Sequence, residues 1–133
     1  MKTIFLDQSG TSLPPRNHAV AERQTGKFVQ LRKGDLEYLV FSPTSITPYH
    51  ADILERFCRE REIAGVYDKG KKRFDIGDPA WSVIGGGKYE VDRTSRRIRL
   101  YDNSMAYGRF DPRGLREKIP LTEGLKDYTV RID

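Results

Sequence analysis

Cysteine and histidine are scarce in this chain of 133 residues, which has one cysteine, Cys58, and two histidines, His18 and His50. A single cysteine excludes an internal disulfide bond, so a reducing cytoplasm is the expected location. These three soft ligands are too few for a zinc site and show no zinc-binding spacing. We therefore expect the protein to hold no metal and no cofactor.

Long hydrophobic runs are also absent. No apolar stretch approaches the ~20 residues that cross a bilayer, and Asp7 interrupts the hydrophobic start too early for the core of a signal peptide. We therefore expect no membrane partner. Hydrophobic residues make up 37% of the chain and charged residues 32%, which predicts one domain with a modest core and a well-solvated surface.

The chain carries a net charge of +5. Such a balance favours anionic partners, namely nucleic acid, phosphate-bearing substrates or acidic proteins, although it is equally explained by the solubility of a small domain. The most basic run, Lys69–Arg73, has no aromatic residues interleaved for base stacking. We interpret it as part of an exposed, mobile insertion, Val66–Pro79, and do not expect nucleic acid to be the partner.

The succession of patterns predicts an α+β fold, a single domain with a mixed β-sheet flanked by two helices. Residues 1–26 are punctuated by glycine and proline and predict an irregular N-terminal arm, with at most a short strand at Thr3–Leu6. The domain proper is expected over residues 27–133. The expected strands are Lys27–Arg32, Leu36–Phe41, Trp81–Ile84 and Tyr128–Ile132, together with the two strands of a hairpin that turns near residues 93–95. The expected helices are Pro48–Ala64 and a short helix from Asp111 or Pro112 to Ile119.

His50 is the first candidate for chemistry. Thr47 is a good N-cap and Pro48 suits the first helical position, so His50 is expected in the first turn of a helix. There the helix dipole disfavours an imidazolium and attracts anions. A neutral imidazole beside a phosphate can act as a nucleophile or a general base. The alternative is a half-buried histidine whose ring bonds the backbone. His18 falls in the irregular arm and is interpreted as a surface residue.

Three consecutive glycines, Gly85–Gly87, precede Lys88. Glycines let the backbone approach a ligand closely or bend a strand, and the alternative is a simple twist or bulge between strands. The segment is not a nucleotide-binding P-loop, because Tyr89 follows the lysine where Ser or Thr is required.

The segment Asn103–Gly108 consists mostly of small residues after a predicted strand. Such a turn can direct successive N–H groups inward as an anion-binding nest, to which Ser104 adds a hydroxyl. An ordinary loop is the alternative.

Lys27 lies at the start of its expected strand. Its ammonium group either is solvated at the end of the strand or binds a phosphate as a point charge.

Taken together, Tyr49–Ile53, Gly85–Lys88 and Ser104–Gly108 resemble the signature blocks of the protein histidine phosphatases, the Janus/Ocnus family. The segment Lys27–Arg32 is similar to the first core strand of that family, and Tyr128–Val130 is similar to its last. The resemblance runs from the first of these strands to the C-terminus, with a gap over the basic insertion.

The resemblance implies a metal-independent phosphatase that hydrolyses the P–N bond of protein phosphohistidine, or of phospholysine and other phosphoramidates. The implied partner is a phosphohistidine-bearing protein or a small phosphoramidate. The resemblance also implies that His50 is catalytic, as nucleophile or general base. The residues implied to bind phosphate are Lys27, Gly87, Lys88 and, through backbone donors, Ser104, Met105 and Ala106.

The chain departs from the animal members of that family at two basic positions. Those members carry an arginine shortly before the histidine, whereas no basic residue lies between Tyr38 and Tyr49 here. They also carry an arginine after the glycines, where this chain has Lys88, which keeps the charge but loses bidentate phosphate geometry. Two alternatives stay open: a non-catalytic module of the same fold that binds phosphate or phosphopeptides, and a nucleic-acid binder that uses the hairpin arginines and the basic loop.

Overall fold

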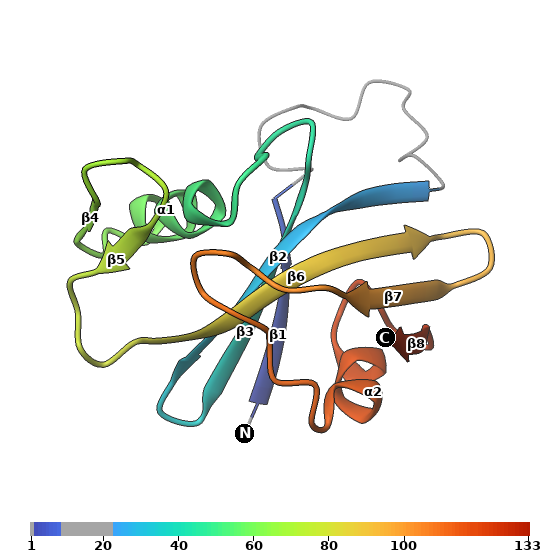
Figure 1. Cartoon of the computed structure of the whole chain (residues 1–133). Coiled ribbons are helices and arrows are strands. Elements are labelled where there is room, and N and C mark those ends of the chain that lie inside the picture. Colours follow the sequence, from blue (N-terminus) through green and yellow to red (C-terminus); the bar gives the residue numbers. More distant parts are fainter. Residues whose placement is uncertain (1, 9–22) are drawn as a thin grey trace.

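A computed structural model describes residues 2–8 and 23–133 of the chain. Within this part, a mixed six-stranded sheet with the strand order β1-β3-β2-β6-β7-β8 forms the centre of the molecule (Figure 1). Its strands are β1 (Lys2–Asp7), β2 (Arg23–Lys33), β3 (Leu36–Pro43), β6 (Ser82–Asp92), β7 (Arg97–Tyr101) and β8 (Thr129–Ile132). A separate pair is formed by β4 (Gly65–Tyr67) and β5 (Phe74–Ile76), and the helices are α1 (His50–Glu60), α2 (Leu115–Lys118) and the 3-10 turn η1 (Ile119–Leu121). The predicted α+β fold is confirmed.

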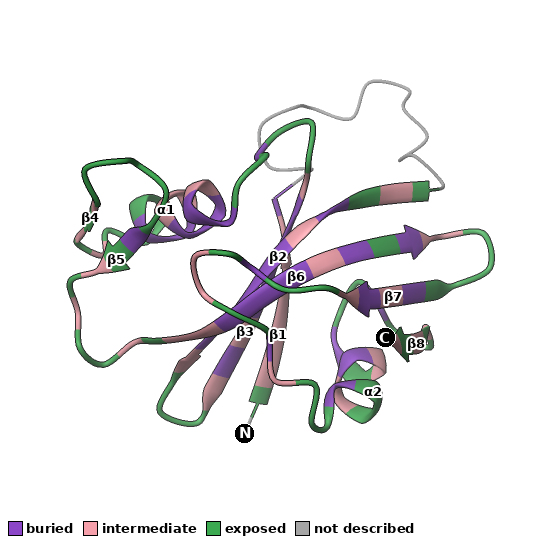
Figure 2. Ribbon diagram, in the orientation of Figure 1, coloured by how far each residue is buried: buried purple, intermediate pink, exposed green. Residues whose placement is uncertain are grey.

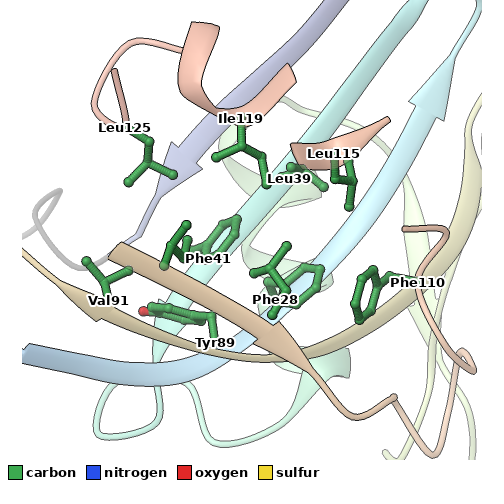
Figure 3. Packing of buried hydrophobic residues seen from close by; sticks show 11 residues of the cluster. Phe28, Leu39, Phe41, Tyr89, Val91, Phe110, Leu115, Ile119 and Leu125 are labelled. Atoms are coloured by element: carbon green, nitrogen blue, oxygen red, sulfur yellow. The ribbon is translucent and has the colours of Figure 1, made fainter. Parts of the chain in front are cut away.

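The alternation of side chains along the strands gives the sheet a core on each face. In β2, Phe28 points toward α2, whereas Val29 and Leu31 point toward α1. The core on the α2 side (Figure 3) consists of Phe28, Leu39, Phe41, Tyr89, Val91, Ile98, Leu100, Phe110, Leu115, Ile119 and Leu125. The core on the α1 side consists of Val29, Leu31, Val40, Ala51, Ile53, Leu54, Phe57, Cys58 and Phe74. Buried residues therefore run through the middle of the central strands (Figure 2).

Helix α1 begins at His50 rather than at Pro48 and ends at Glu60 rather than at Ala64. The predicted N-cap is wrong, because the Thr47 hydroxyl is hydrogen-bonded to that of Ser42, and Tyr49 occupies the N-cap position without a side-chain cap. The predicted apolar stripe is confirmed, since its residues Ile53, Leu54, Phe57 and Cys58 are all buried. Packing of this stripe on the sheet brings the first residue of the helix, His50, down onto the strands.

The predicted irregular N-terminal arm falls mostly on residues 9–22, which include His18 and lie outside the described part, and it is wrong for residues 23–26, which belong to β2. Residues Lys2–Asp7 form β1, which pairs in parallel with β3 at the edge of the sheet. This confirms the short strand expected at Thr3–Leu6. Strand β2 begins at Arg23, four residues before the predicted start, because Arg23–Gly26 pair with the far end of β6.

The insertion expected over residues 66–79 has more regular structure than its composition indicated. Its two ends pair as the hairpin β4–β5, which lies against α1 (Figure 1). Phe74 is buried in the core on the α1 side, and the Tyr67 hydroxyl donates a hydrogen bond of 2.8 Å to Asp52. Most of the segment is exposed, as predicted, including Val66 and the basic run at the tip. The polar composition of the segment concealed the few apolar residues that fasten it.

The triple glycine does not interrupt the sheet, because β6 continues through it from Ser82 to Asp92. The register with β2 shifts between Gln30 and Leu31, beside the glycines, so the alternative of a bulge is confirmed. The predicted β6–β7 hairpin and the last strand are confirmed. The second helix is shorter than predicted, since α2 spans four residues before it tightens into η1.

Candidate functional site

The start of α1, the open face of β2 and β6, and the loop after β7 meet around a cavity of about 350 Å³. We call it the His50 pocket. Its lining residues are Lys27, Tyr49, His50, Ala51, Lys72, Lys88, Asp102, Asn103, Ser104, Met105 and Ala106. The lining includes every residue that the resemblance implies to be catalytic or to bind phosphate except Gly87, whose carbonyl oxygen is hydrogen-bonded to the imidazole.

His50 is held by the backbone of β6. Its side chain is 7% exposed, and its Nε2 lies 2.9 Å from the carbonyl oxygen of Gly87. A carbonyl oxygen only accepts hydrogen bonds, so Nε2 carries the proton and the neutral ring has its lone pair on Nδ1. The alternative predicted from the sequence, a backbone-bonded histidine, is therefore confirmed, and it leaves a second nitrogen for chemistry.

The surroundings of His50 favour its neutral form. Burial lowers the pKa of the imidazole, and the charges of Lys27 and Lys88 lower it further. The hydrogen bond to Gly87 and the charge of Asp102 act in the opposite direction, and the net pKa lies below the ordinary value of 6.5. At neutral pH, Nδ1 is consequently an unprotonated base and nucleophile.

Gly86 provides the flat surface on which the imidazole lies. A Cβ atom at this position would be 2.8 Å from Cδ2 of His50 and 2.6 Å from the carbonyl oxygen of Phe28. Both distances are shorter than van der Waals contact, and the backbone oxygen cannot move aside easily. The glycine therefore lets the strand approach the ring of His50 closely.

Lys27 and Lys88 are direct cross-strand neighbours in the β2–β6 pair, so their side chains leave the same face of the sheet. The Lys27 ammonium lies 5.4 Å from the centre of the Tyr49 ring, and the Lys88 ammonium lies 3.1 Å from a carboxylate oxygen of Asp102. Like charges placed opposite each other are unfavourable in a sheet. An anion bound between them would relieve that repulsion.

The loop after β7 supplies fewer backbone donors than predicted. The N–H of Ser104 donates to the carbonyl oxygen of Gly108 at 3.0 Å, and the Ser104 hydroxyl accepts from the N–H of Tyr107 at 3.2 Å. The Ser104 N–H therefore closes the loop, and a role for Ser104 in binding phosphate stays a prediction. Within residues 2–8 and 23–133, no acceptor faces the N–H groups of Met105 and Ala106. These two remain as candidate anion donors.

A third wall of the pocket comes from the tip of the β4–β5 hairpin, which contributes Lys72. Arg73 in this tip donates a hydrogen bond of 2.6 Å to the carbonyl oxygen of Ala106. The Tyr107 hydroxyl both donates to the carbonyl oxygen of Phe74 and accepts from its N–H, each at 2.7 Å. Sequence reasoning missed this wall, since nothing in a basic run indicates which distant loop it contacts.

Sequence reasoning also did not assign four other pocket residues, Tyr49, Ala51, Asp102 and Asn103. Tyr49, Ala51 and Asn103 belong to segments named as candidates in the sequence, so their closeness to His50 and Ser104 in the chain was the available signal. Asp102 had no such signal. Its role as the partner of Lys88 follows from a backbone turn with φ of 64° that directs the chain away from β7.

The donors in the pocket suit an anion better than a cation. In the part of the chain that the structure describes, no group of three or more His, Cys, Asp or Glu side chains is arranged to hold a metal ion. None of the helices there has the length and hydrophobicity of a membrane-spanning segment. A neutral imidazole, two adjacent lysines and unpaired backbone N–H groups can bind a phosphoryl group and act on it.

Comparison with known proteins gives one result that bears on this geometry. No curated protein matches the sequence significantly. The family model of the Janus/Ocnus family matches residues 27–128, which include most of β2, every strand from β3 to β7, both helices and the whole lining of the His50 pocket. The match covers well over half of the chain, and the protein therefore belongs to the Janus/Ocnus family.

Proposed function

We propose that this protein is a metal-independent phosphatase that hydrolyses the P–N bond of protein phosphohistidine. The observation that carries the proposal is the fixed tautomer of His50, whose Nε2 bonds Gly87 while Nδ1 is left unprotonated in a cationic pocket. Membership of the Janus/Ocnus family supports the same activity. Phospholysine and small phosphoramidates contain the same type of bond and are further substrates of this class.

In the proposed mechanism, the phosphoryl oxygens lie between Lys27 and Lys88 and accept hydrogen bonds from the N–H groups of Met105 and Ala106. Positioning and charge stabilisation are most of what phosphoryl transfer requires from a protein. The leaving imidazole of the substrate departs as the P–N bond breaks and takes up a proton. The Gly87 carbonyl holds the His50 ring at a fixed angle and stabilises the positive charge that the ring acquires.

Two routes are compatible with this arrangement. In the first, Nδ1 of His50 attacks phosphorus, the bond to the substrate nitrogen breaks, and water then hydrolyses the phosphorylated His50. In the second, Nδ1 removes a proton from a water molecule whose oxygen attacks phosphorus directly. A label from the phosphoryl group that stays on His50 after rapid denaturation would identify the first route.

The second candidate function is a non-catalytic module that binds phosphate or phosphopeptides. It is favoured by the fact that the two lysines and the two N–H groups suffice to bind an anion without any chemistry at His50. Nucleic-acid binding has less support. On the open face of the hairpin, Arg99 is paired with Glu90 and with Asp133, and Arg23 is paired with Asp92, so part of the positive charge there is already compensated.

Phosphate release from a phosphohistidine peptide and from phosphoramidate tests the proposal. We expect His50→Ala to lower kcat by about 10²- to 10⁴-fold, the usual range for a lost acid–base group, with an unchanged circular dichroism spectrum. His18→Ala, which replaces the other histidine, is the matched control and should keep wild-type activity. A chelator should leave all rates unchanged.

Full activity of His50→Ala would overturn the assignment of the site. The non-catalytic binding module would be favoured if the wild type hydrolysed neither substrate but inorganic phosphate shifted the NMR signals of residues around His50.

A further inference from the structure

The His50 pocket opens into a second and larger hollow under the tip of the β4–β5 hairpin. We call it the hairpin groove; it has a volume of about 800 Å³ and is lined by Tyr49, Asp68, Gly70, Lys71, Lys72, Arg73, Met105 and Ala106. Four of these residues, Tyr49, Lys72, Met105 and Ala106, also line the His50 pocket. The two hollows are therefore one continuous depression, which is much larger than a phosphoryl group.

Positive charge in the hairpin groove is only partly compensated. The carboxylate of Asp68 accepts hydrogen bonds from the backbone N–H groups of Lys72 and Arg73, at 2.9 and 3.3 Å, and so caps the turn. The Arg73 guanidinium is paired with Asp75 at 2.8 Å. Within the described ranges 2–8 and 23–133, no carboxylate forms an ion pair with Lys71 or Lys72. These two ammonium groups give the groove its net positive charge.

Two large apolar side chains border the same hollow. Tyr49 is 66% exposed and Met105 is fully exposed, which is unusual for residues of this size. Aromatic and methionine side chains are enriched where proteins bind one another, because they bury much area and methionine adapts its shape. A small inorganic phosphoramidate would leave both residues in water, whereas a polypeptide that crosses the groove would cover them.

The groove is fixed in place before any ligand binds. The hydrogen bonds of the Tyr107 hydroxyl to Phe74 and of Arg73 to Ala106 tie the hairpin to the loop that forms the opposite wall. The Arg73 guanidinium also lies 5.1 Å from the centre of the Tyr107 ring. A surface that is already ordered loses less conformational entropy when it binds.

We propose that the hairpin groove binds an acidic segment of the substrate polypeptide, so that the enzyme selects phosphorylated residues that have Asp or Glu a few positions away on one side. Lys71 and Lys72 pair with these carboxylates, while Tyr49 and Met105 cover the peptide between them and the phosphoryl group. An extended chain advances ~3.3 Å per residue, so a few residues suffice to cross the groove. The proposal rests on the proposed function for the identity of the phosphorylated residue.

Binding is tested with fluorescent peptides that carry a non-hydrolysable phosphonate analogue of phosphohistidine. One peptide has three glutamates before the analogue, one has them after it, and one has glutamine at all these positions. We expect one acidic peptide to bind at least fivefold more tightly than the glutamine peptide. Lys71→Glu should abolish this preference, because it reverses a charge in the groove but not in the His50 pocket. Lys69→Glu, in the same turn but outside the lining, is the matched control and should preserve it.

Equal affinities for all three peptides would overturn the groove as a docking site. The same conclusion would follow if a single-stranded RNA of equal length displaced the acidic peptide with similar affinity. Turnover of phosphoramidate is measured in parallel and separates the two proposals. Turnover without a peptide preference rejects the groove alone, whereas a Lys71-dependent preference without turnover on any phosphoramidate rejects the enzyme but supports the docking site.

Discussion

Burial of His50 lowers the pKa of its imidazole, and so do the charges of Lys27 and Lys88. The hydrogen bond to Gly87 and the charge of Asp102 raise this pKa. Burial is the largest of these effects, so the pKa of the folded protein lies below that of the unfolded chain. Between the two pKa values, the unfolded chain binds more protons than the folded one. The free energy of unfolding therefore falls as the pH falls through this window below 6.5, and it is unaffected by His50 at higher pH.

The charges around His50 lead to a prediction of opposite pKa shifts. Lys27→Gln should raise the pKa of His50, because a repelling cation is lost. Asp102→Asn should lower it, because the attracting anion is lost and Lys88 is left without its partner. NMR titration of the His50 ring proton in a His18→Ala background measures both shifts, and the acidic limb of kcat/KM should move with them. Lys69→Gln serves as the control; a shift of the same sign in both test variants would contradict this account.

At the scale of elements, the pocket depends on contacts between segments that are distant in the chain. The hairpin β4–β5 and the loop after β7 are joined through Tyr107 and Arg73, and α1 is joined to β6 through the ring of His50. No single element contains the site. The tip of the hairpin contributes Lys72 only because Phe74, at the start of β5, is buried against α1.

Tyr107→Phe tests how the hairpin is held. The change removes one hydroxyl and leaves the N–H and the carbonyl oxygen of Phe74 without their partner, so we expect a loss of about 1–3 kcal/mol in the free energy of unfolding. Urea denaturation measures this loss, and faster hydrogen exchange at Phe74 locates it. The KM for phosphoramidate should rise because Lys72 is less well placed.

Tyr128→Phe is the matched control for that experiment. Within residues 2–8 and 23–133, the structure shows no hydrogen-bond partner for the Tyr128 hydroxyl, so this variant should be close to neutral. Equal stability of the two variants would show that the Tyr107 hydroxyl does not fasten the hairpin.

At the scale of the whole molecule, two cores on opposite faces of one sheet hold the strands that carry Lys27 and Lys88. The sheet thereby places two like charges opposite each other, and Asp102 compensates only the charge of Lys88. We expect a bound anion to relieve the repulsion that remains. Functional sites commonly reduce stability in this way. The free energy of unfolding should accordingly respond to ligands that occupy the pocket.

Inorganic phosphate should therefore raise the Tm of the protein, because a ligand that binds only the folded state stabilises it in proportion to RT ln(1 + [L]/Kd). Differential scanning fluorimetry with phosphate, against chloride at the same ionic strength, measures the shift. Lys27→Gln should reduce the shift, and Lys69→Gln should leave it unchanged. An equal shift in chloride, or in both variants, would count against an anion site between the two lysines.

Local signals in the sequence predicted the core of the fold well. The alternation of apolar residues around Phe28 and Tyr89 predicts strands, and the apolar stripe that contains Phe57 predicts a helix. Both patterns depend only on residues that are close in the chain, so β2, β6 and α1 were expected near their observed positions. The ends of elements were predicted less well. Thr47 has the chemistry of an N-cap, but the nearby hydroxyl of Ser42 competes for it, and that contact exists only after β3 and the loop have folded.

Residues close together in the chain encode the α+β class, most strands of the central sheet and the residue types of the pocket, so these features could be predicted. Three features became evident only in the folded chain: Ser104 closes its own loop, Gly86 supports the imidazole, and Lys72 lines the pocket from the hairpin. Each of these follows from a contact across several strands. The physical reason is that hydrogen bonds and close packing depend on distance in space, which the order of residues does not specify.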